Sequence, residues 1–132
     1  MFLGAALVLT GCSRDSGPPF DLGWITTRLS EAGYRVTGTS MPPALREIEG
    51  QEGIGSVQCI DALMGAMVDV FCVIRCNDST VCDSLVHRMA DNFGDFQRGP
   101  TILVHSQCGV DPVSGATNCK EARRALGVVG ER

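Results

Sequence analysis

The chain of 132 residues has 15 acidic and 11 basic residues, a net charge of −4, and an apolar fraction of 44%. This composition excludes an intrinsically disordered protein, because the apolar fraction is too high and the charged fraction of 20% is too low. The acidic excess argues against nucleic acid as a partner, since phosphates are bound by a basic face. The length favours a single domain.

The first residues form an uncharged apolar segment that ends in a cysteine. The stretch from Phe2 to Leu9 is too short to cross a bilayer and is typical of the apolar part of a secretory signal peptide. It closes with Leu9-Thr10-Gly11-Cys12, which resembles the lipobox of bacterial lipoproteins. The resemblance implies cleavage before Cys12, diacylglycerylation of its thiol, and often acylation of the new amino group with a fatty acid such as palmitate.

One feature departs from that family. Its signal peptides carry Lys or Arg before the apolar segment, whereas residues 1–11 contain neither. We interpret this as a translation start that lies upstream of Met1. The alternative is a buried N-terminal strand or helix that happens to end in Cys12.

The resemblance divides the chain into three parts. Residues 1–11 are expected to be a lipoprotein signal peptide, residues 12–19 the lipidated cysteine with a short linker, and residues 20–132 one disulfide-stapled domain. The linker spans at most about 29 Å when extended, so the domain is expected close to a membrane. We expect an anchored lipoprotein on the periplasmic or cell-surface side, and Ser13, in place of Asp after the cysteine, favours the outer membrane.

The cysteine count supports the same compartment. The chain has seven cysteines, and the number that remains becomes even once Cys12 carries lipid, as expected for disulfides in an oxidising compartment. Since C-x-x-C pairs are missing, structural disulfides are favoured over a zinc site or a thioredoxin-like redox pair. Proximity in sequence favours three pairs, while Cys72 with Cys82 stays open as an alternative: Cys59–Cys72, Cys76–Cys82 and Cys108–Cys119.

The first part of the domain shows a helix followed by a strand. Residues 22–32 have apolar side chains at helical spacing, with Asp21 as the predicted N-cap and Gly33 just past the end. Residues 34–37 alternate and predict a strand, which Met41-Pro42-Pro43 ends. Residues 44–49 predict a turn of helix and residues 51–55 a loop.

The centre of the chain predicts a β-hairpin and a second helix. Residues 57–62 and 67–75 are rich in β-branched residues and flank a turn at 63–66. A helix is expected from Thr80 to Phe93, with Thr80 and Asp83 as a capping box. Gly94 is expected to end it.

The last part predicts a strand, a loop and a third long helix. Residues 101–105 are strongly β-prone, and residues 109–115 form a loop in which turn propensity explains Asp111 and Ser114 better than a calcium site does. Asn118, with Glu121 three residues later, is expected to cap a helix that carries Cys119, Ala122 and Leu126. Residues 127–132 are expected to fray.

This order of elements predicts an α+β fold. We expect an antiparallel-rich sheet of about four strands with helices mainly on one face. The middle resembles a split βαβ unit of the ferredoxin-like kind, with helices added at both ends. A doubly wound α/β fold is the alternative, which the direct β–β step disfavours.

The sequence contains few residues that indicate catalysis. Nucleophile, nucleotide and zinc-protease motifs are missing, and the two histidines, His87 and His105, are each more typical of structural roles. We therefore expect a non-catalytic binding or interaction module of the cell envelope without a cofactor or metal. Its expected partners are the membrane, through the lipid, and another envelope protein. The predicted binding patch is an apolar part of the sheet face: Phe71, Val73 and Leu103.

Two alternatives remain from the sequence. The first is a small envelope enzyme or redox protein that uses His87 or His105 with a cysteine or acid brought near by folding. The second is a metal or small-ligand binder, which would need unpaired cysteines close to a histidine.

Overall fold

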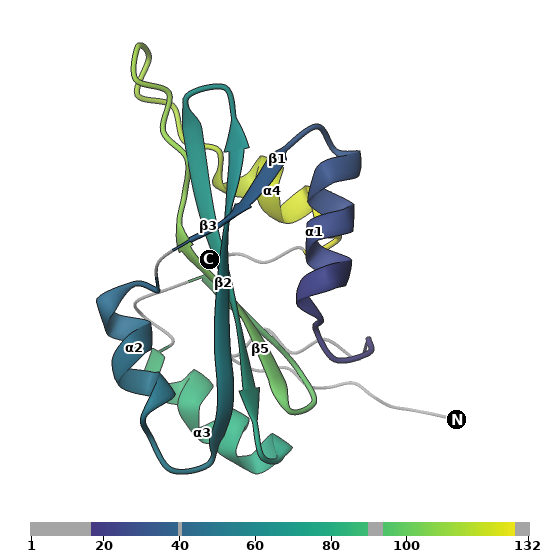
Figure 1. The fold of residues 1–132 in the computed structure, drawn as a ribbon, viewed down its shortest axis with the longest axis vertical. Helices are drawn as coiled ribbons and strands as arrows, with labels where there is room; N and C mark the ends of the chain where they lie inside the picture. The colour runs from purple at the N-terminus through teal and green to yellow at the C-terminus, as the bar shows by residue number, and fades with distance from the viewer. Residues whose placement is uncertain (1–16, 40, 90–93, 129–132) are drawn as a thin grey trace.

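The computed structural model describes residues 17–39, 41–89 and 94–128. Within these ranges the chain is an α+β domain with four helices and an open five-stranded antiparallel sheet in the order β1-β2-β3-β5-β4 (Figure 1). None of the described helices is long and apolar enough to cross a membrane. In chain order, the elements are α1 (Leu22–Glu31), β1 (Arg35–Gly38), α2 (Pro43–Glu49), β2 (Ile54–Met64), β3 (Met67–Cys76), α3 (Ser79–Met89), β4 (Gly94–Arg98), β5 (Thr101–Gln107) and α4 (Cys119–Ala125).

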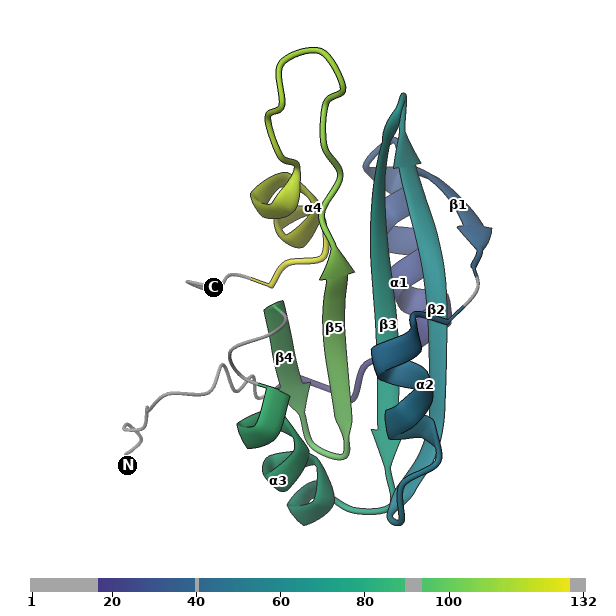
Figure 2. The same ribbon diagram turned by 90° about the vertical axis from the view of Figure 1, so that its left-hand side faces the viewer.

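The predicted hairpin is the longest feature of the sheet. Strands β2 and β3 pair from Met64 and Met67 at the turn down to Cys76, so both strands are longer than the sequence predicted. The turn is Gly65-Ala66, and Gly65 has a φ of 61°, a conformation that glycine adopts without strain. The hairpin tip lies at one end of the long axis of the domain (Figure 2).

The split βαβ unit that the sequence indicated is present around α3. Both β3 and β4 pair antiparallel with β5, so β3 and β4 run parallel to each other with β5 between them. Strand β4 itself was not predicted. Its sequence, Gly-Asp-Phe-Gln-Arg, is largely polar, which is typical of an edge strand. The predicted helix end at 90–93 lies outside the described residues.

Helices cover both faces of the sheet, which corrects the expectation that they lie mainly on one face. Helices α1 and α4 lie on one side of the sheet, and α2 and α3 on the other (Figures 1 and 2). Each side has its own apolar core, one around Phe71 and Leu103 and the other around Cys72 and Ile102. The physical reason is that β3 is apolar on both faces, and both must therefore be buried.

The predicted binding patch is wrong for the same reason. Phe71 and Leu103 have no exposed surface, and Val73 is 4% exposed. All three belong to the core between the sheet and helices α1 and α4. They stabilise the fold and cannot contact a partner.

Caps were predicted for three helices, and the structure shows the expected cap hydrogen bond at α1. The side chain of Asp21 accepts a hydrogen bond from the amide of Trp24, as an N-cap should. Helix α3 begins at Ser79, before the predicted Thr80, and Asp78 accepts the Val81 amide in its first turn. Asp83, the second member of the predicted capping box, accepts a hydrogen bond of 2.6 Å from Gln97 on β4.

Three disulfides are present among the described residues, and they join the pairs that proximity in sequence favoured. Cys59–Cys72 links directly opposed positions of β2 and β3, and Cys76–Cys82 links the end of β3 to α3. Cys108–Cys119 closes the segment between β5 and α4. The described part of the chain is therefore cross-linked in the middle of the β2–β3 hairpin, at the end of β3 and at the base of one loop.

Candidate functional site, a braced loop above a buried polar network

The segment between β5 and α4 forms a loop that projects from one end of the domain. It stands next to the tip of the β2–β3 hairpin and extends beyond the sheet (Figures 1 and 2). Val110 and Thr117 pair as an isolated antiparallel bridge. Beyond this bridge, the Asp111 amide donates to the Ala116 carbonyl and the Gly115 amide donates to the Asp111 carbonyl, both at 2.8 Å. We call residues 109–118 the projecting loop.

Side chains brace the tip of the projecting loop from inside. Asp111 Oδ1 accepts hydrogen bonds from the amides of Val113 at 2.8 Å and Ser114 at 3.4 Å. These two amides hold the pKa of the Asp111 carboxyl below its ordinary value of 3.8. Ser114 Oγ in turn accepts the amide of Ala116. The turn propensity seen in the sequence therefore explains Asp111 and Ser114.

The braced tip presents an apolar side chain to solvent. Val113 is 94% exposed and Val110 is 50% exposed, and these two and Trp24 are the large apolar residues that the described domain leaves exposed. A single exposed valine is common on protein surfaces. Here it sits at the tip of a loop whose backbone conformation is set before any partner arrives, which lowers the entropic cost of binding.

Asp69 of β3 anchors both ends of the projecting loop. Its Oδ1 accepts the amide of Gly109 at 3.0 Å and its Oδ2 accepts Nδ2 of Asn118 at 3.1 Å. Gly109 and Asn118 lie immediately inside the Cys108–Cys119 disulfide and bond to each other through the Asn118 amide and the Gly109 carbonyl. Covalent and polar links thus hold the loop base together.

Position 109 has room only for glycine, because neighbouring atoms occupy the place of a side chain. A Cβ atom there would lie 2.9 Å from Oδ2 of Asp69 and 2.9 Å from Cβ of Met67. The backbone of the loop can therefore approach the carboxylate and the hairpin only because Gly109 has no side chain.

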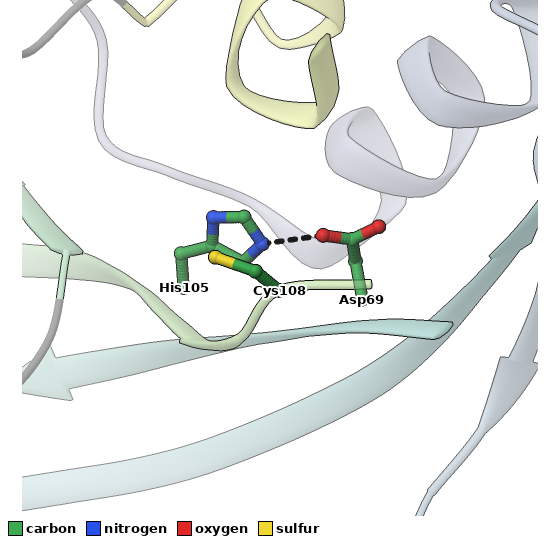
Figure 3. A group of neighbouring side chains, drawn as sticks. All are labelled: Asp69, His105 and Cys108. Carbon is green, nitrogen blue, oxygen red and sulfur yellow. Dashed lines mark hydrogen bonds and ion pairs between the residues drawn. The ribbon is translucent and has the colours of Figure 1, made fainter. Parts of the chain in front are cut away.

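His105 and Arg123 complete the network beneath the loop. His105 Nε2 lies 2.8 Å from Oδ1 of Asp69, and both side chains are fully buried (Figure 3). Arg123 Nε donates to Nδ1 of His105 at 3.2 Å. Because a guanidinium has only donors, Nδ1 must be the acceptor, so the proton lies on Nε2 and is donated to Asp69. The ring also stacks on Phe71, with centroids 4.2 Å apart.

This geometry does not support the two chemical alternatives for His105. His105 lies within hydrogen-bond distance of the Asp69 carboxylate, as the enzyme hypothesis requires. However, both of its ring nitrogens make hydrogen bonds to protein side chains, and the side chains of His105 and Asp69 are inaccessible to solvent. Asp69, His105 and Cys108 also offer ligand atoms within 4.8 Å of one another. Since Cys108 is bonded to Cys119, its sulfur is no thiolate, and this cluster is not a metal site.

The network reaches a pocket through Asn118 and Tyr34. Nδ2 of Asn118 donates to the Tyr34 hydroxyl at 2.7 Å in addition to Asp69. Burial, together with the negative charges of Asp69 and Glu121, raises the pKa of Tyr34 above 10.0, although the Asn118 hydrogen bond lowers it. The pocket has a volume of about 380 Å³ and lies between α4, the residues just after α1 and the end of β2, lined by Ala32, Tyr34, Met64, Asn118, Glu121, Arg124 and Ala125.

The candidate site overlaps only in part with the sequence predictions. The structure places His105 in the network, whereas His87 is exposed on α3, away from it. Asn118 was expected to cap α4, but its side chain turns inward and makes no cap hydrogen bond. Asp69, Arg123 and Tyr34 were not predicted. Asp69 could have been noticed, because a charge on the strand face shared by Phe71 and Val73 needs a buried partner. Cys12 lies outside the described residues.

Comparisons with known protein families, curated proteins and solved structures found no match for this chain.

Proposed function

We propose that the protein is a lipid-anchored, non-catalytic binding module of the cell envelope, and that the projecting loop is its recognition element. The observation that carries this proposal is the braced tip, where an internally hydrogen-bonded loop exposes 94% of Val113. Preorganised loops with an exposed apolar anchor are well suited to enter a pocket of another protein. The partner is expected to be an envelope protein that accepts a β-branched side chain.

The buried network supports this proposal because of its cost. Placing Asp69 and Arg123 in the interior carries a desolvation penalty that an apolar core of the same shape would avoid. In this domain Asp69 accepts two hydrogen bonds from Gly109 and Asn118, the two ends of the loop, and one from His105 beneath it. The groups that carry this desolvation penalty therefore hold the loop in one conformation.

Anchoring through Cys12 rests on the lipobox resemblance and on the cysteine count. The six cysteines after position 12 are all paired in the structure, which leaves Cys12 as the one thiol available for lipid. We propose the outer membrane as the location, on the basis of Ser13. Replacing Cys12 by Ala should move the protein into the soluble fraction of a bacterium that processes lipoproteins. Unchanged membrane fractionation of this variant would contradict anchoring.

The recognition element is tested by site-specific photocrosslinking in intact cells. A photoreactive amino acid at position 113 should give a discrete crosslinked product with one partner. The matched control is the same amino acid at Glu47, an exposed position on α2, on the other side of the sheet from α4. The same products from both positions, or none from position 113, would contradict the role of the loop.

The pocket beside the loop supports a second candidate, a small-ligand binder. Among the described residues only Asn118 bonds to the Tyr34 hydroxyl oxygen, and it does so as the donor, so the hydroxyl hydrogen can be donated to an acceptor in the pocket. Tyr34→Phe removes this donor and keeps the ring. A ligand copurified with the native protein and lost from this variant would favour the second candidate.

A further inference from the structure

We propose that the surface around Trp24 rests on the lipid bilayer and holds the domain in one orientation on the membrane. We call Trp24, Arg28 and Arg98 the Trp24 surface. This inference rests on the proposed anchoring at Cys12 and adds a second, non-covalent contact to it.

The tether enters the domain beside the Trp24 surface. Phe20 is 1% exposed and its amide donates to Oγ1 of Thr101 at 2.8 Å, so the chain is held firmly from this point on. Gly17 packs on Arg98, since a Cβ at Gly17 would lie 3.1 Å from Cζ of Arg98. Between them, Pro18 and Pro19 have fixed φ angles, which restrict the direction of the tether.

The length of the tether limits how far this surface can be from the lipid. Cys12 precedes Gly17 by five positions, so a fully extended chain spans at most about 18 Å between them. Lipid on Cys12 therefore keeps the Trp24 surface near the headgroups, where even a weak contact is favoured by a high effective concentration.

The side chains of this surface suit the membrane interface. Trp24 is the only tryptophan of the chain and is 37% exposed in the first turn of α1. The guanidinium of Arg28 lies 5.5 Å from its ring centroid, and that of Arg98 lies 5.7 Å from it. Tryptophan prefers the headgroup level of bilayers, and the exposed guanidinium of Arg28 suits pairing with phosphate. Because Asp21 caps α1 and Glu31 ends it, we expect the indole rather than net charge to dominate the contact.

The contact would direct the projecting loop away from the membrane. The loop occupies one end of the long axis, whereas residues 17–21 and the start of α1 lie in the other half of the domain (Figure 1). A domain that rests on the Trp24 surface therefore keeps Val113 away from the lipid and available to a partner.

The test uses the fluorescence of the single tryptophan in the full chain purified from membranes with its lipid attached. The protein is reconstituted in vesicles of phosphatidylethanolamine and phosphatidylglycerol, with and without brominated acyl chains. We expect a blue-shifted emission from Trp24, several-fold stronger quenching by the brominated lipid than by aqueous iodide, and reversal of that ratio after solubilisation in detergent. The matched control is the double variant Trp24→Phe and Val113→Trp, which moves the tryptophan to the loop tip. We expect iodide, rather than brominated lipid, to quench the fluorescence of this variant.

The outcomes separate this inference from the anchoring on which it rests. Mass spectrometry of the purified protein shows whether Cys12 carries lipid, and an unmodified Cys12 overturns both proposals. If Cys12 is lipidated and the protein stays with the vesicles, but Trp24 emits as in water and is quenched by iodide, only the membrane contact is wrong. Equal quenching of the tryptophans at positions 24 and 113 by brominated lipid would also overturn the fixed orientation.

Discussion

The backbone amide of Gly109 donates a 3.0 Å hydrogen bond to Oδ1 of Asp69, a residue 40 positions earlier in the chain. This bond joins the root of the projecting loop to the interior of the sheet. It explains why a domain with two apolar cores also contains a fully buried carboxylate. The shape of the loop and the stability of the core therefore depend on the same side chain.

Replacing Gly109 by Ala should destabilise the protein by about 1–3 kcal/mol, because the new methyl group meets Asp69 and Met67 at 2.9 Å. Urea unfolding measures the change. The control is Gly38→Ala on β1, where a Cβ has no atom within 4 Å and the free energy of unfolding should change little. Equal stability of the two variants would show that the loop base is not tightly packed.

Replacing Asp69 by Asn should cost about 1–3 kcal/mol of the free energy of unfolding, because the new side-chain NH2 group is itself a donor and would face one of the donors from His105, Gly109 or Asn118 that Asp69 now accepts. Asp61→Asn on the neighbouring strand β2 is the matched control, and its side chain is only half-buried. We expect that control to change the stability by less than about 0.5 kcal/mol. A similar small loss for Asp69→Asn would contradict a structural role of the network.

The pKa of Tyr34 should be above 10.0, mainly because the ring is buried and also because Asp69 and Glu121 are negative. Tyr34 is the only tyrosine, so the ultraviolet absorbance of phenolate reports it alone. Since the folded pKa is raised, this group leaves stability unchanged below pH 10.0 and lowers it as the pH rises from there through the folded pKa. A midpoint at or below 10.0 in the folded protein would contradict the buried environment.

Asp111 should titrate below 3.8, because its carboxylate accepts the amides of Val113 and Ser114. Its folded pKa is lowered, so these bonds are intact above the ordinary value and are lost as the pH falls through the lower folded value. NMR titration should show the two amides shifting with the same midpoint as the carboxyl group. Midpoints at or above 3.8 would mean that the tip is not braced in solution.

The sequence predicted well those features that depend on neighbours along the chain. The three disulfide pairs are close in sequence, and the helix start at Asp21 depends on its own first turn. Strand β4 was missed because Gly94–Arg98 has few β-prone residues and gains its place by pairing with β5.

The candidate site was harder to predict because its members meet only through tertiary structure. Asn118 has the residue type of a helix cap, yet its side chain turns to Asp69 and Tyr34, which lie 49 and 84 positions earlier. The sequence predicts an open surface at Phe71, Val73 and Leu103, because the residue pattern of a strand does not reveal which helix covers it. The alternation of side chains along β3 places Asp69 on the same face as Phe71. Its partner His105 lies on a different strand, β5, and the sequence does not indicate that contact.

If Val113 is the anchor of a recognition loop, as we propose, the affinity of the photocrosslinked partner for two matched variants will show it most directly. Val113→Ser and Val110→Ser make the same chemical change in the same loop, at the tip and near the base. We expect Val113→Ser to weaken binding about tenfold or more, as for an interface hot spot, and Val110→Ser to leave the dissociation constant within about twofold. Unchanged affinity of Val113→Ser, or equal losses in both variants, would contradict the claim.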